Sequence, residues 1–510
     1  MADIRILQLG NENWNNVYEL PVGIRLDFVR CFTEPPKKPY DLFFIDRELT
    51  AKEVSLLHKE SKAYTVFVTE EFYPDLSGKG CDGGKKDSLA WLCLCKKARR
   101  INYLEIQDFL RQEARYYYPK PYGEKFNLRN LTVARDFSGQ VQWKGNYGVT
   151  LRGEFGSSFR QIAFWRNNLP VFRLPALDFW LEYRKSPAVG IAMTVTEFAS
   201  GSVSQVVGQW EFNEEELENI VHVPGDTDGW LFVSLNARGS GELQIIALHD
   251  RVSRGKHGYF LPGGERYQSS EREEAFRYFE PGDRKAPLCV YFSGYKTLQG
   301  FEGYYMMRNM GCPFLLIAEP RLEGGGFYMG SPEYEKIFVD MIRQAMEELG
   351  FSSGQVVLSG LSMGTFGALY YGCDIRPYAI IAGKPLLSIG NVAANEKHLR
   401  PGGFPTSLDV LQCQCNGMDK EAVKRLNDKF WNKFDGTDWG KSRFVISYML
   451  EDDYDTDAYP ELLSHLQEAG VQVYGKGIHG RHNDNTDGIV NWFLTQYRRI
   501  LREDFGRKLS

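Results

Sequence analysis

Short apolar runs alternate with longer amphipathic segments through the last part of the chain, from residue 288 onward. Each run is strand-length and rich in Val, Ile, Leu and Phe, which is typical of strands that are buried on both faces. The runs occupy 288–292, 314–318, 356–359, 378–382 and 444–450. Because strands that alternate with helices form a mostly parallel sheet covered by helices, the pattern predicts an α/β domain over residues 281–510.

The rest of the chain divides into two regions of different texture. Residues 1–125 carry apolar runs separated by polar stretches long enough for helices, so we expect an N-terminal α/β unit. Residues 126–280 carry short, aromatic-rich runs separated by Gly, Asn and Ser, which predicts a central β-sandwich. Its Trp and Tyr residues suit a carbohydrate-binding-module-like domain, although such residues more often fill a core. A linker at 280–285 marks the boundary to the last domain.

The composition limits the partners that the chain can have. Its 510 residues include 61 Lys and Arg against 66 Asp and Glu, and a net charge of −5 gives no signal for nucleic acid or a membrane surface. The opening MADIRILQLGNEN enters a strand-like run without a signal-peptide pattern, and no stretch reaches the roughly 20 apolar residues of a membrane span. We therefore expect a cytoplasmic protein that binds no nucleic acid.

Two motifs that could indicate a bound metal or nucleotide have simpler interpretations. The nine cysteines include the pairs Cys93/Cys95 and Cys413/Cys415, whose CxC spacing differs from that of a zinc ribbon, so we expect reduced structural thiols and no metal. Residues 78–83 match GxGxxG but follow a turn-like segment in place of a strand, so we expect a surface loop there.

One short motif carries chemistry, the only GxSxG of the chain, at residues 360–364. It lies between the apolar run 356–359 and a segment compatible with a helix, which is the strand–turn–helix context of a nucleophile elbow. Glycine is needed at the flanking positions because the strained turn leaves no room for side chains. Ser362 is therefore the candidate nucleophile, and the last domain is predicted to be α/β-hydrolase-like.

A serine hydroxyl needs a base and an orienting carboxylate, which in this fold follow the serine in the order acid, then histidine. An acidic cluster after the run 444–450 supplies the acid. We choose Asp452 and keep Glu451 and Asp453 as alternatives. The carboxylates that are not used are expected to be solvated and to cap the following helix.

The loop between the last apolar run and the last amphipathic helix holds two histidines. We prefer His482 as the base because it lies nearer the helix start, and we keep His479 as the alternative. A metal site of His479, His482 and Asp484 would need a second ligand cluster, which the sequence does not offer.

Acyl transfer also needs backbone N–H donors for the tetrahedral oxyanion. In this fold the residue after the nucleophile, Met363, supplies one N–H, and the loop after the first strand of the domain supplies the other. In that loop we choose the N–H of Tyr295 over that of Gly294. The three glycines at 324–326 lie on a later loop at the same edge of the sheet, where they either shape the pocket or form a flexible turn.

Four segments carry a resemblance to a known family. The opening IRILQLGNENW, the block YFSGYKTLQGFEGYYMMRNMGCPFLLIAEPR, the elbow VVLSGLSMGTFGALYYG and the tail GIHGRHNDNTDGIVNWF resemble the second accessory secretory proteins of the accessory Sec system in Gram-positive bacteria. The resemblance covers essentially the full length. It implies O-acetylation of N-acetylglucosamine on serine-rich-repeat adhesins before export, through a triad that would be Ser362, Asp452 and His482.

The resemblance also implies partners and a place of action. It implies a complex with the first and third accessory secretory proteins, beside the accessory SecA motor at the cytoplasmic membrane face, with a glycosylated adhesin as substrate. The activated acetyl donor stays unidentified, and we expect no tightly bound cofactor. Two alternatives stay open: a carbohydrate or ester deacetylase with the same residues, and a secretion scaffold without catalysis.

Overall fold

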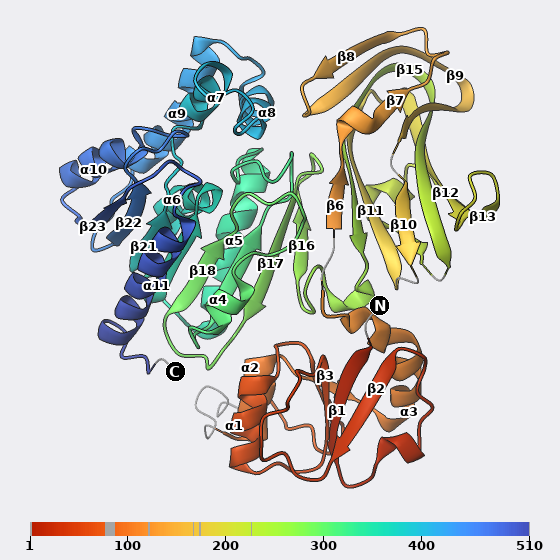
Figure 1. Ribbon diagram of the computed structural model, residues 1–510, viewed down its shortest axis with the longest axis vertical. Helices are drawn as coiled ribbons and strands as arrows, with labels where there is room; N and C mark the ends of the chain where they lie inside the picture. Colours follow the sequence, from red (N-terminus) through yellow and green to blue (C-terminus); the bar gives the residue numbers. More distant parts are fainter. Residues whose placement is uncertain are drawn as a thin grey trace.

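Three separate β-sheets organise the chain, and each occupies its own region of the molecule (Figure 1). The computed structural model describes residues 3–508 except 77–86, 121–122, 167, 173–174 and 226. The predicted surface loop at 78–83 lies outside the described residues. No helix in the described ranges combines the length and the apolar character that crossing a bilayer requires.

The first sheet has five parallel strands in the order β2-β1-β3-β4-β5, which matches the predicted N-terminal α/β unit. Every residue of β3 and β4 is buried, as expected for strands covered on both faces. The elements are β1 (Ile4–Gly10), β2 (Ile24–Val29), β3 (Leu42–Asp46), α1 (Ala51–Glu60), β4 (Val66–Thr69), α2 (Leu89–Lys96), β5 (Arg99–Ile101) and α3 (Tyr103–Asp108).

The second sheet is antiparallel throughout and is built around one very long strand, β15. This strand hydrogen-bonds to β12, β11, β6, β9 and β10, so the ten strands form one curled sheet. The two separate sheets of a sandwich are therefore not confirmed. The strands are β6 (Gly123–Phe126), β7 (Leu131–Val133), β8 (Gln140–Lys144), β9 (Gly148–Trp165), β10 (Leu169–Phe172), β11 (Ala176–Lys185), β12 (Val189–Ala199), β13 (Val206–Phe212), β14 (Val221–Pro224) and β15 (Asp228–Val252).

The third sheet has eight strands in the order β16-β17-β19-β18-β20-β21-β22-β23. The last six in this order, which are β18 to β23 by number, run parallel to one another. The predicted α/β-hydrolase-like class is confirmed. Its strands are β16 (Glu265–Gln268), β17 (Glu274–Glu280), β18 (Leu288–Phe292), β19 (Phe314–Ala318), β20 (Val356–Leu361), β21 (Ala379–Gly383), β22 (Arg443–Met449) and β23 (Gln472–Ile478).

Two strands of this sheet, β16 and β17, come before the linker at 280–285 that we predicted as the domain boundary. They join the parallel strands through antiparallel pairs, β16 with β17 and β17 with β19. Short antiparallel strands have the same sequence texture as the strands of the preceding region, so the local pattern could not assign them to the later sheet.

Helices cover both faces of the third sheet. Along β20, Leu358 belongs to the apolar cluster on the side of α5 and α6, and Val357 belongs to the cluster on the side of α11. The segment between β21 and β22 adds three helices, α7, α8 and α9, which Figure 1 shows grouped near the upper part of the sheet. The helices are α4 (Tyr304–Arg308), α5 (Pro332–Leu349), α6 (Met363–Ile375), α7 (Ile389–His398), α8 (Thr406–Cys415), α9 (Lys420–Asp435), α10 (Ala458–Glu468) and α11 (Thr486–Glu503).

A glycine marks the point where β15 changes partners. The strand pairs with β12 up to Gly239 and with β11 from Leu243 onward. Gly239 has a φ of +89°, and a Cβ atom there would lie 2.0 Å from the carbonyl oxygen of Ala188. Only glycine therefore permits both the backbone conformation and the close approach of the neighbouring chain.

We expect Gly239→Ala to lower the melting temperature of the protein more than Gly201→Ala does. Gly201 also has a positive φ, +75°, but nothing lies within 4 Å of the position that a Cβ atom would take there. Both variants incur the backbone strain, and only Gly239→Ala adds the clash, so their melting temperatures should differ by roughly 3 °C or more in calorimetry. Equal shifts for the two variants would contradict a packing role for Gly239.

Candidate active site

Ser362 lies in the turn between β20 and α6, with a φ of 51° and a ψ of −122°. The flanking glycines explain how the turn closes. A Cβ atom on Gly360 would lie 2.3 Å from the backbone of Gly364, and one on Gly364 would lie 2.1 Å from the carbonyl oxygen of Phe292. The GxSxG motif therefore lets α6 approach two strands closely while the serine projects from the edge of the sheet.

Ser362, His482 and Asp452 form a chain of hydrogen bonds. The Ser362 Oγ lies 2.8 Å from His482 Nε2, and His482 Nδ1 lies 2.8 Å from Asp452 Oδ2. The imidazole is 1% exposed and the carboxylate 8%, so bulk water competes little for either group. The three residues follow β20, β23 and β22, whose carboxyl ends meet at one edge of the parallel sheet.

The three adjoining carboxylates have different partners. Asp452 turns its second oxygen, Oδ1, to the backbone N–H of Tyr454, at 2.9 Å. Asp453 accepts a hydrogen bond from the backbone N–H of His482, at 3.0 Å. Glu451 accepts from the backbone N–H of Gly480 at 2.6 Å. Only Asp452 contacts the imidazole of His482, and the other two hold the backbone of the histidine loop.

His479 lies apart from Ser362. Its side chain is 87% exposed, and its Nδ1 lies 3.0 Å from Glu451 Oε1. The structure therefore brings His482, and not His479, to the serine. His465 lies in α10, where its Nδ1 is 2.7 Å from Asp435.

An aromatic ring that the sequence reasoning missed covers the imidazole of His482. The ring of Tyr454 stacks on it, with centroids 4.2 Å apart and an interplanar angle of 14°. The guanidinium of Arg400 lies over the Tyr454 ring, 3.4 Å from its centroid, and Arg400 Nε also lies 3.3 Å from Asp453 Oδ2. Arg400 thus contacts the two residues that hold the ring and the backbone of His482, and no sequence motif marked it.

The backbone N–H groups that could bind an oxyanion lie on two loops. Met363 is the first residue of α6, so its N–H has no acceptor within the helix. The N–H of Gly294 donates to the carboxylate of Glu302 at 2.6 Å and is therefore occupied. The neighbouring N–H of Tyr295 donates to no protein group within the described ranges. Of these two N–H groups, the one of Tyr295 is therefore left available to a ligand, and its role as an oxyanion donor stays a prediction.

The glycines at 324–326 pack against this region. A Cβ atom on Gly324 would lie 2.3 Å from the ring of Tyr295, and one on Gly325 would lie 2.4 Å from the Met363 side chain. Both glycines have positive φ values. They are therefore needed for close packing beside the candidate oxyanion donors, which a merely flexible turn would not require.

Among the described residues, one group brings three possible metal ligands together: Glu182, His249 and Glu274, all buried. Glu274 is already paired, because Arg251 and Arg266 each donate to its carboxylate at 2.5 Å. Burial raises the pKa of Glu274, but the two guanidinium groups outweigh it and lower that pKa to about 2. Two cations beside the same carboxylate disfavour a third, so the donor set suits an ion-pair network better than a metal.

The described cysteines are free thiols. Burial raises the pKa of both Cys93 and Cys95 to about 12, so these two thiols are uncharged at neutral pH.

The chain matches the family model described as "Accessory Sec system GspB-transporter" over residues 4–507. The chain belongs to this family. The resemblance seen in the sequence is thereby confirmed. Two family members support the assignment: an accessory Sec system protein of Staphylococcus aureus is 36% identical over 99% of this chain and 97% of its own, and one of Streptococcus gordonii is 34% identical over 99% of both.

A solved structure shares the whole fold of this family member. This structure is a chain of the Glycosylation Associate Protein (Gap123) complex from Streptococcus agalactiae, which superposes on the present chain with a TM-score of 0.87 and 34% sequence identity. The match covers 99% of the present chain and 100% of the Streptococcus agalactiae chain. The arrangement of three sheets is therefore common to the two proteins.

We expect Tyr454→Ala to slow the covalent labelling of Ser362 by a fluorophosphonate roughly tenfold or more. Loss of the ring leaves the imidazole of His482 free to move from the serine, and small displacements of a base have large effects on rate. Tyr454→Phe is the matched control, because it keeps the ring and removes only the hydroxyl, which accepts from Asn483 at 2.8 Å. Equal slowing by both variants would contradict a role for the stack.

Asp455, three residues after Asp452, gives a prediction about pH. Its buried carboxyl accepts hydrogen bonds from the N–H groups of Leu387 and Ser388, at 2.7 and 2.8 Å, yet burial raises its pKa to about 7. The folded protein therefore keeps a proton that the unfolded chain releases near pH 4, so the contribution of Asp455 to stability falls as pH rises from about 4 to about 7.

The variant Asp455→Asn keeps the acceptor oxygen but does not titrate. Its melting temperature relative to the wild type should rise between about pH 4 and pH 7 and then level off. A difference that stays constant across this interval would contradict the raised pKa.

Proposed function

We propose that the chain transfers acetyl groups to sugar hydroxyls, specifically to N-acetylglucosamine on serine-rich-repeat adhesins. The observation that carries the proposal is the 2.8 Å approach of Ser362 Oγ to His482 Nε2, with Asp452 on the other ring nitrogen. This arrangement supplies a nucleophile, a base and an orienting acid. Membership of an accessory Sec family supports an exported protein as the substrate, and the similarity to a chain of a Glycosylation Associate Protein complex supports a glycosylated one.

The first half of the reaction would acylate the enzyme. His482 Nε2 takes the proton from Ser362 as Oγ attacks the carbonyl carbon of an activated acetyl donor. The N–H groups of Tyr295 and Met363 bind the oxyanion, and Asp452 stabilises the imidazolium. When the tetrahedral intermediate collapses, the bond to the leaving group breaks, and His482 returns its proton to that group.

The second half would transfer the acetyl group to the sugar. His482 takes the proton from a hydroxyl of N-acetylglucosamine, and the hydroxyl oxygen attacks the acetyl-serine. Collapse of the second intermediate releases the acetylated sugar and gives the proton back to Ser362. If water attacks the acetyl-serine in place of the sugar, the same residues give hydrolysis. Whether the site binds a sugar hydroxyl beside the acetyl-serine and excludes water therefore decides between a transferase and a deacetylase.

We also propose that the protein works within a complex at the cytoplasmic face of the membrane. The Streptococcus agalactiae relative is one chain of a Gap123 complex, which supports assembly with the first and third accessory secretory proteins. The accessory SecA motor and the glycosylated adhesin complete the proposed set of partners.

We expect Ser362→Ala and Asp452→Asn to abolish or strongly reduce acetylation of the exported glycoprotein, measured by mass spectrometry of its glycans. Loss of the orienting acid costs about 10³-fold or more in comparable arrangements. Glu451→Gln is the matched control, since glutamine keeps an oxygen that can accept from the N–H of Gly480 and the side chain at this position does not contact the imidazole of His482.

Each other outcome decides against part of the proposal. A gain of acetyl groups in the Ser362→Ala strain would indicate a deacetylase. Unchanged acetylation in that strain, with export blocked when the whole protein is deleted, would indicate a scaffold without catalysis.

A further inference from the structure

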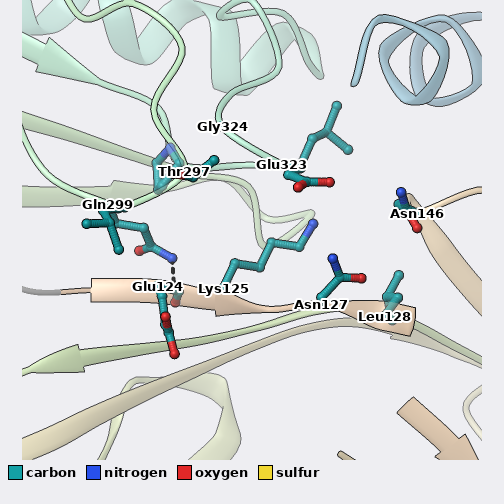
Figure 2. A pocket seen from close by; sticks show the side chains of 12 residues that line it. Glu124, Lys125, Asn127, Leu128, Asn146, Thr297, Gln299, Glu323 and Gly324 are labelled. Carbon is teal, nitrogen blue, oxygen red and sulfur yellow. Dashed lines mark hydrogen bonds between the residues drawn. The ribbon is translucent and has the colours of Figure 1, made fainter. Parts of the chain in front are cut away.

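A pocket of about 250 Å³ lies between the second sheet and the third (Figure 2). One wall is β6 with the residues that follow it, and Asn146 from the turn between β8 and β9 adds to that side. The other wall consists of two loops of the third sheet, around 297–299 and 320–324, which follow β18 and β19. These loops leave the same edge of the sheet as Ser362, so the pocket lies at the edge that carries the candidate active site.

Lys125 is the most unusual residue of the pocket. Successive side chains of β6 point to opposite sides, and Figure 2 shows Lys125 extending into the pocket while the side chain of Glu124 points away. No carboxylate or carbonyl within the described ranges is paired with its ammonium. Burial lowers the pKa of Lys125, although the charges of Glu182, Asp409 and Glu323 act in the opposite direction and raise it. Lys125 is half-buried, and its ammonium is free to donate to a ligand that enters the pocket.

The remaining groups of the pocket define the chemistry of that ligand. The carboxylate of Glu323 faces the same space, so a phosphate or another strongly anionic group would meet a like charge. The amides of Asn127 and Asn146 and the hydroxyl of Thr297 can donate or accept hydrogen bonds. Leucine side chains supply apolar surface. This mixture suits an uncharged molecule with many hydroxyl or amide groups and an apolar ring face, and the volume suits one small unit of it.

The pocket is held in shape by Gln299, which fastens the loop of the third sheet to β6. Its backbone N–H donates to the carbonyl of Gly123 at 2.7 Å, and its side-chain amide donates to the carbonyl of Glu124 at 2.8 Å (Figure 2). Its side-chain oxygen accepts from Arg251 at 2.8 Å. Both walls are therefore fixed before any ligand binds, which reduces the ordering cost of binding.

The pocket also shares a residue with the candidate active site. Gly324 lines the pocket and packs against the ring of Tyr295, and the next residue, Gly325, packs against Met363. One loop thus separates the pocket from the two backbone donors proposed for the oxyanion. The pocket and the candidate oxyanion donors therefore share one loop of the third sheet.

We infer that this pocket is an acceptor subsite that holds one sugar unit of the glycan, with the Lys125 ammonium donating to a hydroxyl or to an N-acetyl carbonyl oxygen. The inference rests on the proposed function for the identity of the glycan. It assigns to the second sheet a part in selecting the sugar, through β6.

Calorimetric titration of the full chain with a serine-rich peptide that carries N-acetylglucosamine, and with the same peptide without sugar, tests the subsite. Lys125→Met removes the ammonium and keeps the length of the side chain, and Glu323→Gln removes the charge and keeps the shape. Lys185→Met is the control, because Lys185 lies at the end of β11, outside the pocket, with its ammonium 2.8 Å from Glu214. Melting temperatures check that each variant is folded.

We expect the wild type to bind the glycopeptide more tightly than the bare peptide. Lys125→Met and Glu323→Gln should each weaken that binding about tenfold, and Lys185→Met should leave it unchanged. Unchanged affinity in folded Lys125→Met protein would overturn the inference. So would no preference of the wild type for the sugar, or a Lys125→Met variant that loses affinity for acetyl-coenzyme A and not for the glycopeptide.

Hydrolysis of p-nitrophenyl acetate separates the subsite from the proposed chemistry, because that ester needs a reactive serine and no sugar. Lys125→Met should retain this hydrolysis, while Ser362→Ala should lose it and still bind the glycopeptide. If the wild type neither hydrolyses the ester nor transfers acetyl groups, the proposed function fails, and the titration still decides whether the pocket binds sugar.

Discussion

The buried ion pair between Glu274 and Arg251 joins the second sheet to the third. Arg251 lies on β15 and Glu274 on β17, and both side chains are almost completely excluded from solvent. A buried pair of charges is stable only when its remaining hydrogen-bonding capacity is used. Here Arg266 binds the same carboxylate, and the third nitrogen of Arg251 donates to Gln299. The charges that join the two sheets therefore also hold the loop on which the pocket and Tyr295 depend.

This network extends to His249, which connects the same loop to the core of the second sheet. Its Nδ1 lies 2.7 Å from the amide of Gln299, and its Nε2 lies 2.7 Å from Glu182. Burial lowers the pKa of His249, although Glu182 opposes this. The two sheets thus meet through directional polar contacts as well as through apolar packing. Such contacts specify one orientation of the sheets, whereas apolar surfaces alone tolerate several.

The sequence predicted the parts of the site that depend on local pattern. The elbow at 360–364 could be identified because a strand, a strained turn and a helix occur together within a short segment. The base could be narrowed to two histidines because the fold fixes which loop carries it. The sequence did not determine which of Glu451, Asp452 and Asp453 is the acid. Their hydrogen-bond partners depend on how the loop at 479–484 folds over them.

Contacts between distant segments explain what sequence reasoning missed. Tyr454, which stacks on His482, and Arg400, which lies over the Tyr454 ring, are separated by more than fifty residues, and neither belongs to a motif. Their contact exists only after the loop that follows β22 and the segment between α7 and α8 meet. The strands β16 and β17 resemble the strands before them, and only their pairing with β19 assigns them to the third sheet. In the sequence, Lys125 is an ordinary polar residue of a strand. Its role in a pocket depends on the loops of the third sheet that face it, and these are distant in the sequence.

The residues next to the imidazole come partly from an insertion, and this has an evolutionary consequence. Arg400 and Phe404, which both stack on Tyr454, lie between α7 and α8, in the group of helices inserted between β21 and β22. No strand of the sheet passes through that segment. Descendant sequences can therefore alter or lengthen it without disturbing strand pairing, and so change the surroundings of the base while the scaffold is inherited intact.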